Sequence, residues 1–435
     1  MNLSDIKIKP QTLGGGVLLG YYCIYTFIAR FSHIGGRNVD LIVIGVTAIS
    51  AFLLLVTLFI NKSASAENRL NNAFVYWLPF LGVLVFQYLK GYCNTSYLLL
   101  FGLFVLLLML SNMSYLLCNR IVKSFQIMAV IAVLGTLTQL VIPSLHKIII
   151  SVLYTNEGVK YIQSYAQRGY YSGFFYQVGD AAFYLSVGIL ATFLVKQDAK
   201  RRIVSCLLFT LFMIVEGKRS LVVLVLVILL YTYIIQGKGH KRAMRFAVAG
   251  LIVMLGWIVV KEISANLSNI ILFKKLATTI SFLEGGDIEG VLFSSGRSWL
   301  YDLAKKLFHE NPITGIGWAE FSKISGRVNN QVTSVHNIYL QLLCETGIVG
   351  FGSFILAAGT TAVRTIRAYI SGRSAKQLEY GILQQFLLLS IAGQLLFLLF
   401  GLVENPLYNG NCLAFYFLMV LMGESIMLKL KAKQL

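Results

Sequence analysis

The stretch GILQQFLLLSIAGQLLFLLFGL, residues 381–402, contains no charged side chain and is long enough to cross a membrane as a helix. Similar apolar runs recur along the chain. They predict transmembrane helices over 13–30, 39–60, 72–90, 97–117, 125–145, 175–195, 203–216, 220–236, 246–260, 337–360, 381–402 and 411–428. We therefore expect an all-α, polytopic membrane protein with about twelve spans, which form a single membrane domain over residues 1–435.

The composition agrees with a membrane protein. Hydrophobic residues make up 57% of the chain and charged residues only 13%, whereas a soluble chain carries about 25% charged residues. In a soluble protein a net charge of +19 would suggest a nucleic-acid partner, but here the charges lie at the ends of apolar runs. We interpret them as determinants of membrane topology and expect no nucleic-acid partner.

Lysine and arginine side chains set the expected orientation. With the N-terminus inside, the predicted inner segments hold 21 of them and the short outer connections hold 5. Because cytoplasmic segments are enriched in these residues, we expect both termini to be cytoplasmic. Two longer segments then lie outside, at about 146–174 and at 261–335.

The 261–335 segment is expected to form a large extracytoplasmic loop of 75 residues within the membrane domain. Inside it, Leu300, Leu303, Ala304 and Leu307 repeat at helical spacing, which predicts an amphipathic helix. Asn311-Pro312 should end that helix, and Arg297 should lie near its start.

The most informative polar residues lie in HNIYLQLLCETGIVG, residues 336–350. Asn337, Gln341 and Glu345 follow one another at a spacing of four residues, so they share one face of an otherwise apolar helix. A carboxylate in a span is costly and should face the bundle or a wet cavity. A functional site, and a helix start with polar packing groups, explain the pattern about equally well.

Two further motifs place cations on the predicted outer face. The first is Glu216-Gly217-Lys218-Arg219-Ser220, where Lys218 and Arg219 suit an anionic ligand or an interfacial ion pair with Glu216. The second is Ser294-Ser295-Gly296-Arg297-Ser298-Trp299, where the start of a helix next to Arg297 suits a phosphate or is ordinary capping.

A fourth motif is Arg168-Gly169-Tyr170-Tyr171-Ser172-Gly173-Phe174, before the sixth span. Its glycines and aromatic rings suit sugar stacking or a re-entrant turn, but an interfacial aromatic belt explains the tyrosines better. The sequence has no phosphate-binding loop, no dinucleotide-binding glycine motif and no HExxH, so we expect neither a cofactor nor a metal site.

Taken together, these motifs resemble the signature of the O-antigen ligase and O-antigen polymerase family. His336-Asn337 followed by Gly347 and Gly350 fits the signature residue for residue. Ser295-Gly296-Arg297 with Trp299, Asn311-Pro312-Ile313-Thr314-Gly315-Ile316-Gly317, and Gly217-Lys218-Arg219-Ser220 are also similar to that family.

The resemblance implies a metal-independent, multi-span, GT-C-like membrane glycosyltransferase in the bacterial inner or plasma membrane. Its donor would be a glycan on undecaprenyl diphosphate. By position, Arg219 and Arg297 would hold the diphosphate, and His336 would orient or deprotonate the acceptor hydroxyl. The other candidate substrate-binding residues are Lys218, Arg168, Asn337 and Glu345.

Within this family we predict a polymerase of lipid-linked repeat units for O-antigen, capsule or exopolysaccharide. Its partners would be the lipid bilayer, the lipid-linked glycan, and a flippase and a chain-length regulator of the same pathway. One alternative is a ligase that moves the glycan to lipid A-core or another acceptor. Some ligases carry a tryptophan shortly after Gly-x-x-Gly, where Phe351, Gly352 and Ser353 stand here. A transporter or flippase is the other alternative, although the large outer loop argues against it.

Overall fold

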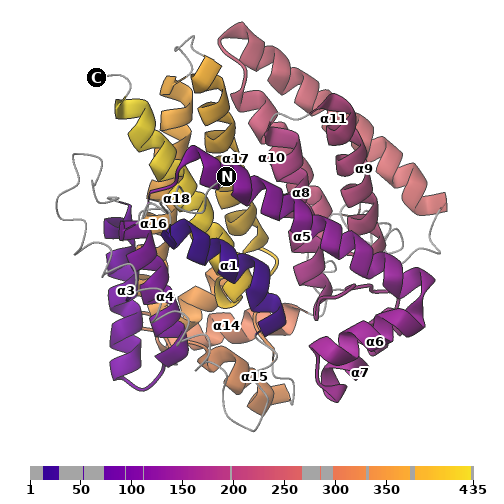
Figure 1. Ribbon diagram of the computed structural model, residues 1–435. Helices are drawn as coiled ribbons and strands as arrows, with labels where there is room; N and C mark the ends of the chain where they lie inside the picture. Colours follow the sequence, from indigo (N-terminus) through magenta and orange to yellow (C-terminus); the bar gives the residue numbers. More distant parts are fainter. Residues whose placement is uncertain are drawn as a thin grey trace. The chain divides into compact units, whose positions relative to one another are not determined.

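The structure is a computed structural model, and it describes residues 13–28, 52, 73–93, 95–110, 112–195, 198–266, 285, 297–329, 333–372 and 378–432. Every regular element in these ranges is helical, which confirms the all-α prediction (Figure 1). The helices are α1 (Leu13–Ile28), α3 (Phe74–Leu89), α4 (Thr95–Leu110), α5 (Tyr115–Val141), α6 (Pro143–Leu153), α7 (Asn156–Gln167), α8 (Val178–Leu194), α9 (Ala199–Val215), α10 (Arg219–Ile235), α11 (His240–Asn266), α14 (Ser298–Glu310), α15 (Glu320–Asn329), α16 (Ile338–Ser371), α17 (Leu378–Phe400), the 3-10 helix η5 (Pro406–Tyr408) and α18 (Gly410–Ala432).

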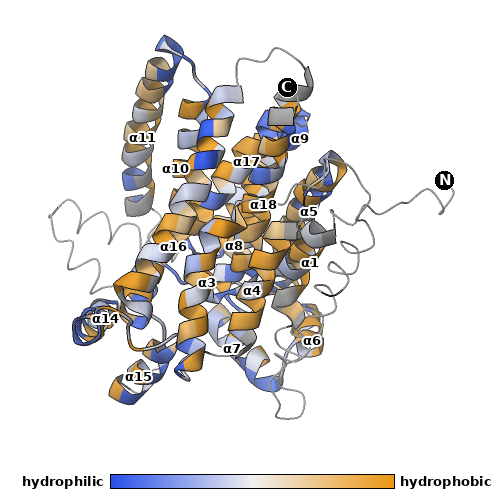
Figure 2. Ribbon diagram, turned by 90° about the vertical axis from the view of Figure 1, so that its left-hand side faces the viewer, coloured by the Kyte–Doolittle hydropathy of each residue, from blue (hydrophilic) through white to orange (hydrophobic). Residues whose placement is uncertain are grey.

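Several helices are suited to a membrane by length and composition. Among the described residues, five helices are long and apolar enough to cross one, within α5, α11, α16, α17 and α18. Shorter apolar helices include α3, α8 and most of α10, and hydrophobic residues predominate along most of these helices in Figure 2. The findings support a membrane protein, and twelve spans remain a prediction. The predicted span at 39–60 lies outside the described residues, apart from Phe52.

The chain forms two compact units. The first comprises Met1–Ser124 and Asp302–Leu435. Its central helix is α18, which packs against α1, α4, α16 and α17 and is buried along most of its length. Trp77 on α3 lies in the same core, with its ring edge-on to the rings of Phe354 and Tyr416. These ring contacts join α3, α16 and α18 in one core.

The second unit is Phe125–Tyr301. Its central helix is α8, which packs against α9 and α10 and is almost entirely buried. Gly188 lets α8 approach α5, because a Cβ at this position would lie 2.3 Å from that of Ala129. The predicted outer segment at 146–174 contains most of α6 and all of α7, which the sequence did not predict as helices.

Two boundaries differ from the prediction. The sequence places the break between the predicted spans 97–117 and 125–145 near 121, but α5 already begins at Tyr115, so Arg120 and Lys123 lie inside α5. The reason is local, because the Ser114 hydroxyl accepts a hydrogen bond from the Leu117 N–H at 3.2 Å and so caps the start of α5. The second difference is at α11, which continues to Asn266. The segment predicted as a loop from residue 261 therefore begins as a helix.

The amphipathic helix predicted inside the outer loop is confirmed. α14 begins at Ser298, directly after Arg297, and ends at Glu310, before Asn311-Pro312. Leu300, Ala304 and Leu307 are buried, as their spacing predicted.

Candidate functional site

His336 lies in the short segment that leads into α16. The next residue, Asn337, is the N-cap of that helix, and its side-chain oxygen accepts hydrogen bonds from the N–H groups of Tyr339 (3.0 Å) and Leu340 (3.2 Å). The cap explains why Asn follows the histidine, since it satisfies two N–H groups that have no partner within the helix. His336 is therefore fixed just outside the start of a candidate membrane span.

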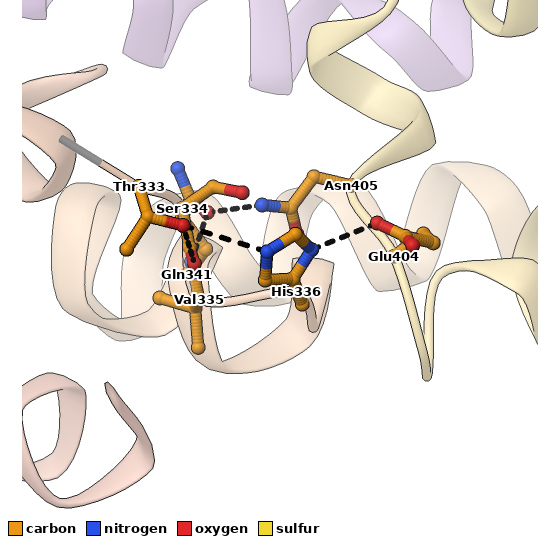
Figure 3. A network of polar contacts seen from close by, with 7 residues as sticks. All are labelled: Thr333, Ser334, Val335, His336, Gln341, Glu404 and Asn405. Atoms are coloured by element: carbon orange, nitrogen blue, oxygen red, sulfur yellow. Dashed lines mark hydrogen bonds and ion pairs between the residues drawn. The ribbon is translucent and has the colours of Figure 1, made fainter. Parts of the chain in front are cut away.

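The backbone and side chain of His336 are both constrained. Its φ angle is +56°, a left-handed conformation that is uncommon for any residue other than glycine. Its Nδ1 lies 2.8 Å from the Glu404 carboxylate, and its Nε2 lies 3.5 Å from the Thr333 hydroxyl (Figure 3). The side chains of His336 and Glu404 are both partly exposed. The imidazole ring is therefore held by a carboxylate and is still accessible from the protein surface.

Gln341, one turn into α16, connects the segment before His336 to the rest of the unit. Its side-chain oxygen accepts from the Val335 N–H at 3.1 Å and from the Asn405 amide at 2.5 Å (Figure 3). Its amide nitrogen donates to Glu345 at 3.1 Å. The polar stripe of Asn337, Gln341 and Glu345 predicted from the sequence therefore exists. Through Gln341 it holds the segment that carries His336.

Glu345 is fully buried and accepts four hydrogen bonds from protein groups. In addition to Gln341, the donors are the backbone N–H groups of Ala319 (2.9 Å) and Phe321 (3.2 Å) and the hydroxyl of Tyr408. Burial raises the pKa of Tyr408 above its usual range, and the neighbouring carboxylate acts in the same direction, so this hydroxyl stays a donor at neutral pH. We call His336, Glu404, Gln341 and Glu345 the histidine site.

The glycine motifs of this unit bring two backbones together. α16 is broken at Gly347, where φ is +63° and a Cβ would lie 2.1 Å from the Ile313 oxygen. At Gly315, φ is +70° and a Cβ would lie 2.3 Å from the Glu345 carbonyl. Hydrogen bonds join the two segments on both sides of the break, from Ile316 N–H to Cys344 O (2.9 Å), from Gly317 N–H to Glu345 O (2.9 Å) and from Ile348 N–H to Pro312 O (2.9 Å).

This docking corrects the prediction of a continuous helix over 337–360. Gly347 breaks the helix to receive the 312–317 segment. Gly350 instead allows close helix packing, since a Cβ there would lie 3.1 Å from Val83 on α3. Next to the docked segment, the Trp318 ring is stacked between Tyr97 (4.6 Å) and Tyr408 (4.5 Å). The 312–317 segment is thus fixed to the helix that follows His336.

The second unit contains the turn Glu216-Gly217-Lys218-Arg219, which we call the cation turn. Glu216 is fully buried, and one of its oxygens accepts from the Thr136 hydroxyl at 3.1 Å. Its other oxygen has no hydrogen-bond partner within the described part of the chain. Gly217 has a φ of +79°, which the sharp reversal between α9 and α10 requires.

The predicted site residues are divided between the two units. Lys218 is half-buried and lies against Gly179 at the start of α8, and Arg219 is the first residue of α10. Arg168 ends α7, is exposed and lies over the Tyr165 ring at 5.8 Å. Arg297 precedes α14 and is half-buried. The structure brings His336, Asn337 and Glu345 together in the first unit, and convergence of Arg219 with Arg297 stays a prediction.

Glu404, Asn405 and Tyr408 are the members of this network that sequence reasoning missed. A signal for them was present, because the predicted topology places the 403–410 connection on the same side of the membrane as His336. A glutamate directly after an uncharged span, followed by Asn-Pro, is unusual enough to mark that connection.

The fold and this site define a class: a helical membrane protein with a partly exposed histidine–carboxylate pair at the start of one span. The comparison with known families agrees. Residues 204–355 match the family model described as O-antigen ligase, which confirms the resemblance to the O-antigen ligase and polymerase family. The match includes the cation turn, Arg297, His336 and Gly347 and ends before Glu404. No curated protein matches the chain.

Proposed function

We propose that the protein is a membrane glycosyltransferase that polymerises undecaprenyl-diphosphate-linked repeat units into O-antigen, capsule or exopolysaccharide. The family match supports a function of the ligase or polymerase type, and hence an enzyme that transfers glycans. The observation that carries the chemistry is the contact of 2.8 Å between His336 Nδ1 and Glu404.

In this proposal the histidine pair acts on the acceptor. Glu404 accepts a hydrogen bond from the Nδ1–H group of His336, which leaves Nε2 as the basic nitrogen of the ring. Nε2 takes the proton of a sugar hydroxyl while that oxygen attacks the anomeric carbon of the donor. The bond from the anomeric carbon to the phosphate oxygen breaks, and the lipid diphosphate leaves with the electron pair.

The arginines act on the leaving group. Arg219 and Arg297 each lie at the start of a helix, where free N–H groups also favour an anion. A guanidinium presents a planar pair of donors to phosphate and neutralises the charge that develops as the bond breaks. We propose that both reach one diphosphate, with Lys218 beside them.

Glu345 and Gln341 are positioning residues in this scheme. Because Glu345 is fully buried and its oxygens are occupied by protein donors, we assign it to holding the histidine segment and not to contact with substrate. Asn337 has the same kind of role, because its side-chain oxygen caps α16.

The positions of the candidate residues favour transfer over transport. His336 comes directly before the N-cap residue of α16, Arg297 comes directly before α14, and Arg219 is the first residue of α10. Transporters bind their substrates near the middle of discontinuous spans. We propose that these helix starts face the outside of the bacterial inner or plasma membrane, with both termini in the cytoplasm. A flippase would then deliver the substrate, and a chain-length regulator would limit the product.

Deletion of the gene separates a polymerase from a ligase. The surface glycan and the lipid-linked glycan of the deletion strain are compared on gels with those of the complemented strain. Loss of a polymerase leaves single repeat units on the final acceptor. Loss of a ligase leaves long chains on the lipid carrier, and this outcome would replace our proposal with the ligase that the matching family model describes. An unchanged pattern in both pools would reject both enzymes.

A further inference from the structure

The second unit carries a cluster of tyrosines that the proposed chemistry does not use. Tyr161 and Tyr165 lie one turn apart on α7, with ring centroids 4.6 Å apart. Tyr176 stacks on Tyr161 at 4.5 Å, and Tyr170 lies 6.2 Å from Tyr165. All four tyrosines are half-buried, so each residue is partly exposed. We call this cluster the tyrosine platform, and Arg168 lies over its Tyr165 ring.

The helix that presents the platform is polar, unlike the helix before it. α6 exposes apolar side chains, with Ile148 63% and Val152 72% exposed. α7 instead exposes Asn156, Glu157 and Lys160. A membrane belt would place its rings among apolar neighbours at the headgroup level. Because the apolar surface belongs to α6, we place the platform on the side of the hairpin that faces water.

The segment after the platform is fixed to the end of α5. Gly173 donates its N–H to Gln139 at 2.9 Å and accepts from His146 Nε2 at 2.8 Å. With φ at +58°, Gly173 comes so close that a Cβ would lie 2.7 Å from the Thr136 nitrogen. Thr136 is also the residue that donates to Glu216 in the cation turn. The tyrosine platform and the cation turn are therefore anchored to the same turn of α5.

This shared anchor suggests what the platform binds. In a lipid-linked glycan the first sugar is bonded directly to the diphosphate. If the cation turn holds the diphosphate, the sugars next to it lie toward the neighbouring segment. Tyrosine rings stack on the C–H faces of sugars, and their hydroxyls and Arg168 can bond to sugar oxygens. Resting on the proposed function and on the predicted outer position of 146–174, we propose that the tyrosine platform binds the sugars nearest the diphosphate of the donor.

The test separates sugar binding from catalysis. The probe is the oligosaccharide that mild acid releases from the lipid-linked pool of the producing cells, and it carries neither lipid nor diphosphate. Binding to the full-length protein in nanodiscs is measured by calorimetry or by saturation-transfer NMR. The Tyr161→Leu/Tyr165→Leu variant removes two rings, and the Tyr161→Phe/Tyr165→Phe variant keeps them. Tyr88→Leu on α3, which removes an exposed tyrosine of the first unit, is the matched control.

We expect saturable binding to the unchanged protein and to the Tyr88→Leu control, and binding about tenfold weaker or worse in the leucine pair. The phenylalanine pair should retain most of the affinity, which shows that a loss in the leucine pair is due to the rings. Equal binding by the leucine pair, or no binding by the unchanged protein, would overturn the proposal.

A transfer assay with lipid-linked substrate keeps the two proposals apart. If the unchanged protein binds the oligosaccharide through the platform but never lengthens a chain, the proposed function fails and the sugar site stands. If chains lengthen and the leucine pair shows an unchanged KM, the platform fails and the function stands. The expected result is a raised KM in the leucine pair with kcat nearly unchanged, because the reacting groups are untouched.

Discussion

The histidine site and the cation turn are each built on a buried carboxylate, but the two carboxylates differ in how completely they are satisfied. Glu345 accepts four hydrogen bonds, two of them from backbone N–H groups. Glu216 accepts one, from Thr136, and its second oxygen has no hydrogen-bond partner among the residues that the structure describes. A fully bonded carboxylate fixes its surroundings, whereas a partly bonded one keeps the capacity for a further partner.

The difference suggests a division of labour. The histidine site is preorganised, as expected of groups that must meet an acceptor hydroxyl in one orientation. The cation turn retains unused hydrogen-bonding capacity next to Lys218 and Arg219, so it is the part that we expect to adjust when a diphosphate arrives. Substitutions in the two regions should therefore have different effects. Those in the histidine site should change kcat and its pH dependence, and those in the cation turn should weaken binding of the lipid-linked donor.

The largest effect is expected at the histidine pair. His336→Gln should lower kcat by about 10²–10⁴-fold, because the general base is lost. Glu404→Gln keeps an acceptor at Nδ1 but removes the charge, and should lower kcat by about 10–100-fold. Transfer from purified lipid-linked donor measures both, and donor binding should be retained. Full activity of His336→Gln would mean that His336 has only a structural role at the start of α16.

The next largest effect concerns the arginines. Arg219→Lys and Arg297→Lys should each lower kcat/KM by about 10²-fold, because lysine keeps the charge but loses the paired donors. Donor binding should weaken as well, which distinguishes these variants from His336→Gln. Arg367→Lys, an exposed arginine near the end of α16, is the control and should be unaffected. Normal chain lengths in both lysine variants would remove the diphosphate assignment.

The sequence alone predicted some of these features and missed others. Apolar runs predicted most of the described spans, and the spacing of Leu300, Ala304 and Leu307 predicted α14, because both depend on neighbouring residues alone. The break at Gly347 was missed because a glycine inside an apolar helix also suits close packing. Glu404 was missed because its partner lies 68 residues away, and only the fold brings the two together.

The break itself provides a third test, with a smaller effect on activity than on stability. Gly347→Ala places a Cβ 2.1 Å from the Ile313 oxygen at a φ of +63° and should destabilise the protein by more than about 2 kcal/mol. Gly352→Ala, five residues later in α16, meets nothing within 4 Å and should be neutral within about 0.5 kcal/mol. Thermal unfolding in detergent compares the two. Equal melting temperatures would mean that the 312–317 segment does not hold the break.

The smallest effect is expected at Tyr408. Removing its hydrogen bond to Glu345 tests whether Tyr408 positions other groups or takes part in catalysis. Tyr408→Phe keeps the stack on Trp318 and removes only the donor to Glu345, so stability should fall by about 1–2 kcal/mol. The carboxylate retains three other donors, so kcat should fall by less than about tenfold.

Because burial raises the pKa of Tyr408, its hydroxyl stays protonated from about pH 5 to 8, where histidines titrate. The variant should therefore lower the pH–rate profile without changing its shape, while KM for the donor stays constant. A loss of kcat as large as that of His336→Gln would mean that Tyr408 itself takes part in proton transfer, and a raised KM would bring Glu345 back into contact with the substrate.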